Sequence, residues 1–500
     1  MSTTPDPVPK PLDYLTECGK DGDPALVMRG ETLSWKDLRT RVGRMAAWLA
    51  EQIPEKGARV ATWDSKGELT CLMPLAAARA GLVHVPINPL LKRAQVKHIL
   101  EDSGASLLIA NKARFASLED GDVPVGCRIF EERAMLAEVA EQGDALALSE
   151  ADPGELTAVL YTSGSTGRPK GVMLSHANLW LGAVSVAHYL GMAADDVTLA
   201  VLPLSFDYGQ NQLFSTWYAG GSVVPLDYLT PRDVIKACAK HSITTLAAVP
   251  PLWVQLTEQE WPAEAVQPMR RMTNSGGALT EDLVRELRQI FPDARLFPMY
   301  GLTEAFRSTY LDPDLVDEQP TSMGQAIPFA EILVVDEDGE IASEGELVHC
   351  GPLVAQGYWQ DAERTAQRFK PAPAASKYGG KAVWSGDNVR RAEDGLLYFV
   401  GRDDAMIKSQ GNRISPQEIE DAARATGLAE EAVAFGIADE RQGHAIHLVV
   451  RGEGDEDALR AALRRELPNF MQPAVVRWVD AMPLNPNGKI DRTKLKREAA

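Results

Sequence analysis

The segment YTSGSTGRPKGV, residues 161–172, gathers glycines, small hydroxyl side chains and two cations in one short stretch of chain. It follows TAVLY, an apolar run typical of a buried strand. Its glycines can adopt backbone angles closed to other residues, so the chain can curl and direct its N–H groups inward. A concave surface of donors beside a cation suits a phosphate group, and we interpret the segment as a phosphate-binding loop. The candidate ligands are Thr162, Ser163, Gly164, Ser165, Thr166, Gly167 and Lys170.

This segment departs from the Walker A pattern, in which a lysine is followed by the serine or threonine that binds magnesium. Pro169 precedes Lys170 here, and Gly171 follows it. The segment is therefore a different kind of nucleotide loop or none, and a solvated linker is the alternative. The preceding strand and the many directed donors favour the phosphate loop.

The composition is that of an ordinary globular protein with room for large cores. The 500 residues correspond to about three domains of roughly 150 residues each. A formal charge of −19 argues against broad nucleic-acid binding, because phosphate backbones recruit basic surfaces. Neither a secretory signal nor an apolar run of ~20 residues is found, so we expect no integral membrane association.

Cysteine usage points to a reducing compartment. The five cysteines are widely spaced and include no CxxC pair, which fits neither a disulfide framework nor a zinc site. We therefore expect a cytoplasmic protein. Independently of the cysteines, we expect it to be a monomer or a homodimer.

The elements that must position the loop alternate between helices and strands. SWKDLRTRVGRMAAWLAE is typical of an amphipathic helix capped by Ser34, and ARVATW and GLVHVPI of buried strands, which together predict a parallel sheet. EILVVDEDGEIASEGELVHCG predicts a part rich in strands. The last hundred residues, including SPQEIEDAARA as a capped helix, predict a compact α+β module, and GRDDAMIKSQGN is the best boundary before it. The expected fold is α/β: a large N-terminal region with parallel-rich sheets, and a small mobile C-terminal domain.

Several segments together resemble the AMP-forming adenylating superfamily, which includes acyl-CoA synthetases, luciferases and nonribosomal peptide adenylation domains. The resemblance covers nearly the whole chain, and its pieces occur in the order found in the family. They are YTSGSTGRPKGVMLSH, NSGGALT, YGLTEA, GELVHCGPLVAQGYW, WSGDNVRR, YFVGRDDAMIKSQGNRISPQEIE and NPNGKIDR. The resemblance implies that ATP and a carboxylic acid form an acyl-adenylate and pyrophosphate, after which a thiol displaces AMP.

The resemblance also implies which residues hold the nucleotide and Mg²⁺. The loop at 162–170 would hold the β- and γ-phosphates, Glu304 and Thr162 would bind Mg²⁺, and Thr303 would lie near the α-phosphate. Tyr300 and the turn of Gly276, Gly277 and Ala278 would lie against adenine. Asp387 would accept hydrogen bonds from the two ribose hydroxyls, a role that suits an acceptor-only carboxylate. Arg402 would be a second nucleotide contact.

The C-terminal domain carries the remaining catalytic group in this resemblance. Lys489 would be delivered to the active site, where a cation stabilises the charge that develops as two anions react. The division falls at 1–401 for the N-terminal adenylation domain and 402–500 for the mobile domain. The hinge aspartate falls at Asp404, although Ala405 replaces the family's usual second aspartate.

The acyl substrate is the least defined part of the prediction. LPLSFDYGQNQ resembles the amino-acid-activating branch, where the aspartate binds an α-ammonium, and it also resembles acyl-CoA ligases of exosortase and exopolysaccharide loci. Asp207 is thus a candidate amine ligand, with a helix-capping role as the alternative, and we expect Phe206 and Gly301 to contact the acyl group. Trp217, Tyr218, Trp253 and Phe306 are possible pocket aromatics or core residues.

Two questions about the activity stay open at this level. The thiol is expected to be that of CoA in an acyl-CoA synthetase of fatty acid metabolism, with the phosphopantetheine of a separate carrier protein as the alternative. A binding protein that has lost catalysis is a further alternative, although the family's charged residues are all present.

Overall fold

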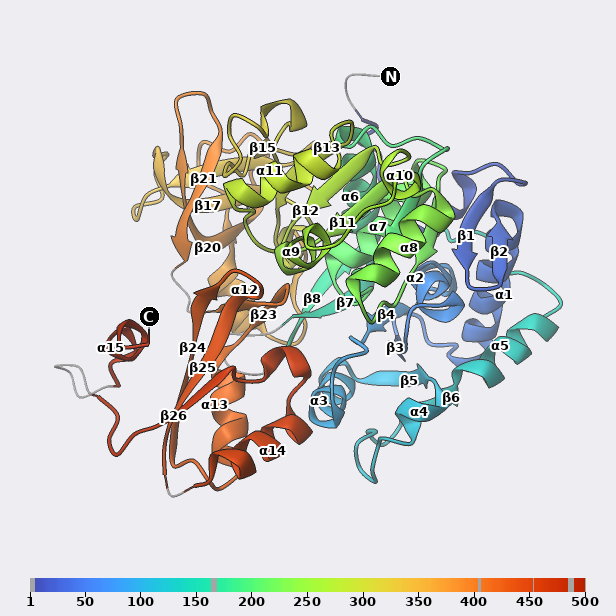
Figure 1. Cartoon of the computed structure of the whole chain (residues 1–500). Coiled ribbons are helices and arrows are strands. Elements are labelled where there is room, and N and C mark those ends of the chain that lie inside the picture. The colour runs from blue at the N-terminus through green and yellow to red at the C-terminus, as the bar shows by residue number, and fades with distance from the viewer. Residues whose placement is uncertain (1–4, 163–168, 403–405, 453, 484–489, 500) are drawn as a thin grey trace.

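The computed structural model describes residues 5–162, 169–402, 406–452, 454–483 and 490–499 (Figure 1). Within these residues the chain forms two large parallel-rich sheets, an antiparallel sheet and a smaller C-terminal unit. The expected mixed α/β fold with a C-terminal small domain is therefore confirmed. In Figure 1 the C-terminal unit (orange to red) lies beside the body formed by the rest of the chain.

The first large sheet has seven strands in the order β18-β8-β7-β4-β3-β5-β6, of which β7, β4, β3, β5 and β6 run parallel. Its strands are β3 (Arg59–Trp63), β4 (Val83–Pro86), β5 (Ala105–Ala110), β6 (Arg128–Glu131), β7 (Leu156–Thr162), β8 (Lys170–Ser175) and β18 (Gly357–Tyr358). The helices of this region are α1 (Trp35–Gln52), α2 (Glu68–Ala80), α3 (Arg93–Ser103), α4 (Lys112–Phe115), α5 (Glu132–Glu141) and α6 (His176–Tyr189).

Helix α1 shows how closely local sequence determines an element. Ser34 is its N-cap, and its hydroxyl accepts a hydrogen bond from the backbone N–H of Asp37 while the Asp37 carboxylate accepts from the Ser34 backbone. This reciprocal capping box fixes the first turn. The predicted apolar face is buried as expected, because it packs on α2 within the main core.

The second large sheet has nine strands in the order β15-β14-β13-β12-β11-β9-β10-β1-β2, with the six from β13 to β1 parallel. Its strands are β1 (Pro24–Met28), β2 (Glu31–Ser34), β9 (Val197–Ala200), β10 (Ser222–Pro225), β11 (Thr245–Ala248), β12 (Arg271–Asn274), β13 (Arg295–Tyr300), β14 (Thr309–Tyr310) and β15 (Gln325–Ala326). Its helices are α7 (Asp207–Tyr218), α8 (Pro231–His241), α9 (Pro250–Thr257), α10 (Ala263–Val266) and α11 (Glu281–Ile290), and short 3-10 helices span Leu12–Glu17, Thr303–Ala305 and Pro313–Leu315.

The antiparallel sheet and the C-terminal unit complete the fold. The antiparallel sheet contains β16 (Glu331–Val335), β17 (Glu344–Cys350), β19 (Phe369–Pro371), β20 (Lys381–Arg391) and β21 (Leu397–Arg402), beside α12 (Ala362–Arg368). The C-terminal unit contains the hairpin β22 (Ile407–Ser409) and β23 (Asn412–Ile414), the sheet β24 (Glu431–Asp439), β25 (Gly443–Arg451) and β26 (Val475–Trp478), and α13 (Pro416–Ala425), α14 (Glu456–Glu466), the 3-10 helix Asn469–Met471 and α15 (Arg492–Arg497).

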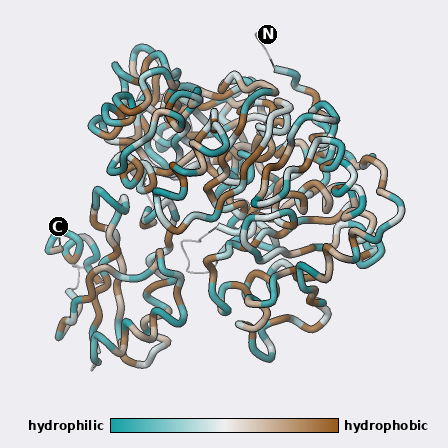
Figure 2. Tube along the Cα trace, turned by 45° about the vertical axis from the view of Figure 1, so that its right-hand side comes forward, coloured by the Kyte–Doolittle hydropathy of each residue, from teal (hydrophilic) through white to brown (hydrophobic). Residues whose placement is uncertain are grey.

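Figure 2 shows apolar (brown) stretches running through the inner parts of the chain trace, while hydrophilic (teal) stretches lie mainly at outer turns. The largest core joins α1, α2, α6 and α7 with strands of three sheets. Helices α2, α6 and α7 are buried over most of their length, whereas α1 is buried along one face. The C-terminal unit has a core of its own around α13, β25 and α14. No helix of the described residues is long and apolar enough to cross a membrane.

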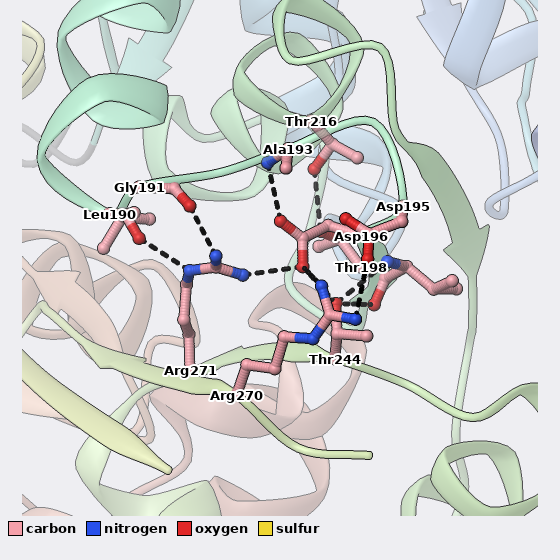
Figure 3. A network of polar contacts seen from close by, with 11 residues as sticks. Leu190, Gly191, Ala193, Asp195, Asp196, Thr198, Thr216, Thr244, Arg270 and Arg271 are labelled. Atoms are coloured by element: carbon pink, nitrogen blue, oxygen red, sulfur yellow. Dashed lines mark hydrogen bonds and ion pairs between the residues drawn. The ribbon is translucent and has the colours of Figure 1, made fainter. Parts of the chain in front are cut away.

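A buried charged cluster ties together the amino ends of β9, β11 and β12 (Figure 3). Asp196 accepts hydrogen bonds from Arg271 Nη1 at 2.7 Å, Thr244 Oγ1 at 2.8 Å and the backbone N–H of Ala193 at 2.8 Å. Arg271 also donates from Nε to the carbonyl of Leu190 at 2.6 Å. Because Asp196 is fully buried and forms several hydrogen bonds, it holds these amino ends together. Ligands of such sheets bind at the opposite, carboxyl ends of the strands.

We expect Asp196→Asn to lower the free energy of unfolding by about 1.5–3 kcal/mol, the range for hydrogen bonds to charged groups. Asp195→Asn is the matched control, because Asp195 is 67% exposed and its ion pair with Arg270 contributes at most about 1 kcal/mol. Urea unfolding followed by circular dichroism measures both variants. Equal stability of the two would contradict the role assigned to the cluster.

Candidate active site

A cavity of about 1580 Å³ opens where the parallel strands of both large sheets end. Residues that follow β9, β12 and β13 line it, including Leu204, Gly276 and Thr303, together with Thr162 at the end of β7. Ligands of open α/β sheets bind in the crevice at the carboxyl ends of the strands. This volume exceeds the roughly 300–1,000 Å³ of a typical small-molecule site and leaves room for a nucleotide beside a second substrate.

Lys170 and Glu304 meet at the centre of this cavity wall. Lys170 Nζ lies 2.9 Å from Glu304 Oε1 and 2.7 Å from the hydroxyl oxygen of Tyr358, and that hydroxyl donates to Glu304 Oε1 at 2.7 Å. Tyr358 lies in β18, which pairs with β8, the strand that begins at Lys170. This strand pairing brings the ammonium group and the phenol together. The Glu304 side chain is 4% exposed, which strengthens its interactions with charged ligands.

The donor set beside Glu304 fits Mg²⁺ bound mostly by substrate oxygens. Thr162 stands opposite Lys170 across β7 and β8, and its buried hydroxyl has no hydrogen-bond partner among the described residues. Over that part of the chain no group of three or more His, Cys, Asp or Glu side chains could hold a metal by itself. Mg²⁺ commonly uses one or two protein ligands plus phosphate oxygens and water, and Glu304 with Thr162 could supply these protein ligands.

Tyr300 and Asp387 come together from different sheets. The Tyr300 hydroxyl donates a short hydrogen bond to Asp387 Oδ2, and Asp387 is buried. Arg402 lies opposite Asp387 in the pairing of β20 with β21, which places its backbone in the same region. Neither Tyr300 nor Asp387 is among the residues that line the cavity, so their contact with a nucleoside stays a prediction.

The turn after β12 has the geometry that the sequence predicted. Gly276 has a φ of +82°, a conformation that side chains other than glycine rarely adopt, and it lines the cavity together with Ser275. Gly277 accepts a hydrogen bond from the Asn274 side chain, and a Cβ on it would lie 3.1 Å from Pro250. Ala278 continues this turn.

Asp207, which lines the cavity close to Thr303, is already bonded within the protein. Thr303 Oγ1 donates to Asp207 Oδ1 at 3.1 Å, and Arg307 Nη1 lies 3.8 Å from Asp207 Oδ2. Burial raises the pKa of Asp207, whereas the positive charge of Arg307 opposes that rise. Asp207 is the first residue of α7, after the N-cap residue Phe206, and the backbone N–H of Tyr208 also interacts with its carboxylate, so the helix-capping alternative stays a prediction.

Arg307 is the site residue that sequence reasoning missed. Its guanidinium is 2% exposed, stacks 4.4 Å from the ring centre of Tyr208 and lines the cavity. The residue before it, Phe306, has a φ of +55°, which turns the chain sharply between Thr303–Ala305 and β14. Arg307 lies three residues after Glu304, and this closeness was the only hint of a role in the sequence. No known motif requires an arginine at that spacing.

The possible pocket aromatics are core residues. Trp217, Trp253 and Phe306 are fully buried in hydrophobic clusters and are not among the residues that line the cavity. Tyr218 stacks edge-on with Trp180 instead. Gly301, in contrast, lines the cavity beside Thr303, and a Cβ there would lie 3.0 Å from the backbone of Arg307.

One wall of the cavity comes from the C-terminal unit. The turn between β22 and β23, at Gln410 and Gly411, lies against Val249 and Gly276. Gly411 has a φ of +78°, and a Cβ there would lie 2.7 Å from Val249 Cγ2, so a side chain at this point would push the two parts of the chain apart.

Some predicted site residues lie outside the described part of the chain. These are Ser163, Gly164, Ser165, Thr166 and Gly167 of the phosphate loop, the hinge residue Asp404 and Lys489.

Comparison with known proteins shows which family the chain belongs to. The sequence model of the AMP-binding enzyme family matches residues 18–359, and that of the AMP-binding enzyme C-terminal domain matches residues 418–489. The chain belongs to the AMP-binding enzyme family.

The chain resembles segments of much longer synthases. It is 31% identical over 485 residues to surfactin synthase subunit 2 of Bacillus subtilis (strain 168), and that match covers 94% of this chain but 13% of the relative. It is 29% identical over 484 residues to bacitracin synthase 3 of Bacillus licheniformis, covering 95% of this chain and 7% of that one. The chain thus spans a small part of either relative.

Among solved structures, o-succinylbenzoate CoA synthetase from Bacillus subtilis superposes with a TM-score of 0.85 at 24% identity, covering 98% of both chains. That structure contains the product analogue OSB-NCoA. The likeness shows a shared fold from end to end.

Proposed function

We propose that the chain activates a carboxylic acid with ATP and then transfers the acyl group to the thiol of CoA. The observation that carries this proposal is the ion pair of Lys170 with Glu304, which lines the same cavity as Thr303 and is held by the buried Tyr358 hydroxyl. Membership of an adenylate-forming family and the shared fold with a CoA synthetase support it.

In the first half-reaction the carboxylate oxygen attacks the α-phosphorus of ATP, the bond to the β-phosphate oxygen breaks, and pyrophosphate leaves with the electron pair. Lys170 and the loop at 162–170 would hold the departing phosphates, and Thr303 would orient the α-phosphate. Mg²⁺ bound at Glu304 and Thr162 would neutralise phosphate charge. Tyr300, Asp387 and Arg402 would fix the nucleoside, because correct positioning removes much of the entropic barrier.

In the second half-reaction the thiol sulfur attacks the acyl carbon, the bond to the AMP oxygen breaks, and AMP leaves while the thiol proton passes to solvent. We propose that residues 402–500 move as a unit about Asp404 between the two half-reactions and that Lys489 serves the first. The separate core of the C-terminal unit is consistent with such a movement.

The alternative is adenylation of an amino acid and its transfer to a separate carrier protein, which the synthase relatives favour. The Asp207 contacts favour the first proposal. Arg307 already supplies a cation near this carboxylate, so an α-ammonium group would enter a site that contains a positive charge.

Pyrophosphate release from ATP with a panel of carboxylic acids tests the proposed function, and mass spectrometry of reactions containing CoA identifies the thioester. We expect acid-dependent pyrophosphate release and an acyl-CoA product. Release without acyl-CoA formation would favour the carrier-protein alternative, and ATP binding without release would favour a protein that has lost catalysis.

A further inference from the structure

The acyl end of the cavity contains more hydrogen-bonding capacity than the protein itself uses. Arg307 Nε is buried without a hydrogen-bond partner among the described residues, and its ion pair with Asp207 is too long, at 3.8 Å, for a hydrogen bond. Ser205 Oγ, which also lines the cavity, is buried and likewise without a partner there. Buried polar groups without partners are uncommon in proteins, and where two of them belong to residues that line one cavity, a bound ligand is one way to complete them.

These groups lie next to the expected reaction centre. The Thr303 hydroxyl, which we place near the α-phosphate, donates to Asp207 Oδ1 at 3.1 Å. Asp207 contacts Thr303 directly, and Arg307 contacts Asp207, so both lie close to the place where we expect the carboxylate to react. With Thr303 placed near the α-phosphate as proposed, a substituent on carbon 2 or carbon 3 of the acid would lie within reach of Asp207 and Arg307.

The charges of the pair select the chemistry of that substituent. An ammonium group would be attracted by Asp207 but repelled by Arg307, and a second carboxylate would meet the opposite pair of forces. A plain alkyl chain would leave the guanidinium donors unpaired, which is costly for a buried charged group. A hydroxyl can donate to Asp207 and accept from Arg307 at once.

We propose that the activated acid is a 2- or 3-hydroxy acid whose hydroxyl binds between Asp207 and Arg307. This inference rests on the proposed function and names its substrate class. Arg307 then determines specificity rather than catalysing the reaction, because it contacts the substituent and not the reacting atoms.

A matched series of four-carbon acids tests the proposal: butyrate, 2-hydroxybutyrate, 3-hydroxybutyrate, 2-aminobutyrate and succinate. We expect one of the hydroxy acids to exceed butyrate in kcat/KM for pyrophosphate release by about 10- to 100-fold, the effect of hydrogen bonds to charged partners. Preference for butyrate, 2-aminobutyrate or succinate in the wild-type protein would overturn the proposal.

Two substitutions should change this order in opposite directions. Arg307→Met leaves the Asp207 carboxylate alone and should shift preference toward 2-aminobutyrate, while the isosteric Asp207→Asn should shift it toward succinate. Both should lose the advantage of the hydroxy acid over butyrate. Arg295→Met is the control, because Arg295 lies over the Phe297 ring at the opposite end of β13 with its side chain 53% exposed, and it should leave the order unchanged. Persistence of the hydroxy-acid preference in both site variants would contradict the assignment.

A second measurement separates this inference from the proposed function. The increase in melting temperature caused by each acid in the presence of AMP reports binding without turnover, because a ligand that binds the folded state stabilises it. The hydroxy acids should give the largest increase in the wild-type protein, whether or not pyrophosphate is released. The same ranking without pyrophosphate release would reject the proposed function alone, and release without this ranking would reject the hydroxy-acid inference alone. If Arg307→Met does not fold, the wild-type series and Asp207→Asn still decide.

Discussion

Replacing Glu304 with glutamine is expected to slow pyrophosphate release by about two to three powers of ten, the effect of losing one preorganised charge-stabilising group. The Glu304 carboxylate receives Lys170 and the Tyr358 hydroxyl and is almost completely buried, so its charge is weakly screened. The variant should also need more Mg²⁺ for half-maximal rate. Both quantities come from one Mg²⁺ titration of pyrophosphate release.

Tyr358→Phe is the graded control for this result. It removes one donor from Glu304 but leaves the carboxylate charge, so we expect a loss of about tenfold or less. A Glu304→Gln rate within a factor of two of the wild type, at an unchanged Mg²⁺ requirement, would remove Glu304 from the reaction.

Lys489→Ala is expected to reduce acyl-adenylate formation by about two to three powers of ten while sparing thiolysis of a pre-made acyl-adenylate by CoA. The reason is that charge builds up between two anions only in the first half-reaction. Lys489 lies outside the described residues, so this expectation comes from the motif NPNGKIDR and the charge argument.

The two half-reactions are measured separately, as pyrophosphate release and as conversion of the pre-made adenylate to acyl-CoA. Lys494→Ala is the control, because Lys494 lies in α15 close to Lys489 in sequence and is 48% exposed. A parallel loss of both half-reactions in Lys489→Ala, or of neither, would show that the lysine has another role.

Local sequence predicted the regular elements because each depends on a few neighbouring residues. The helix begun by Ser34 has the capping box that starts its first turn, and α8 begins with Pro231, whose fixed φ suits the first helical position. The capped helix at SPQEIEDAARA is only partly right. It forms at Pro416–Ala425, but the buried Ser415 hydroxyl makes no capping bond and the proline opens the helix instead.

The clustering of Lys170, Thr303, Glu304 and Gly276 around one cavity could be predicted because these residues lie within contiguous motifs. The acyl side could not, because its properties come from side chains that different elements bring together. Asp207 begins α7, whereas Arg307 follows a 3-10 helix almost a hundred residues later, and only their juxtaposition turns a candidate amine ligand into half of an ion pair. The same holds for Tyr358, which the sequence placed in a motif without a role.

Under the proposed function, the Gly411 turn would make the lifetime of the acyl-adenylate depend on how two parts of the chain fit together. A mixed anhydride is hydrolysed wherever bulk water reaches it, and part of the wall that would exclude water here belongs to the C-terminal unit. The rate at which the acyl-adenylate is hydrolysed would then depend on how tightly this turn packs against Val249, and not only on the shape of the cavity. While the turn stays packed, the acyl-adenylate would be protected from water until a thiol binds, so little ATP would be lost to hydrolysis even at a low thiol concentration.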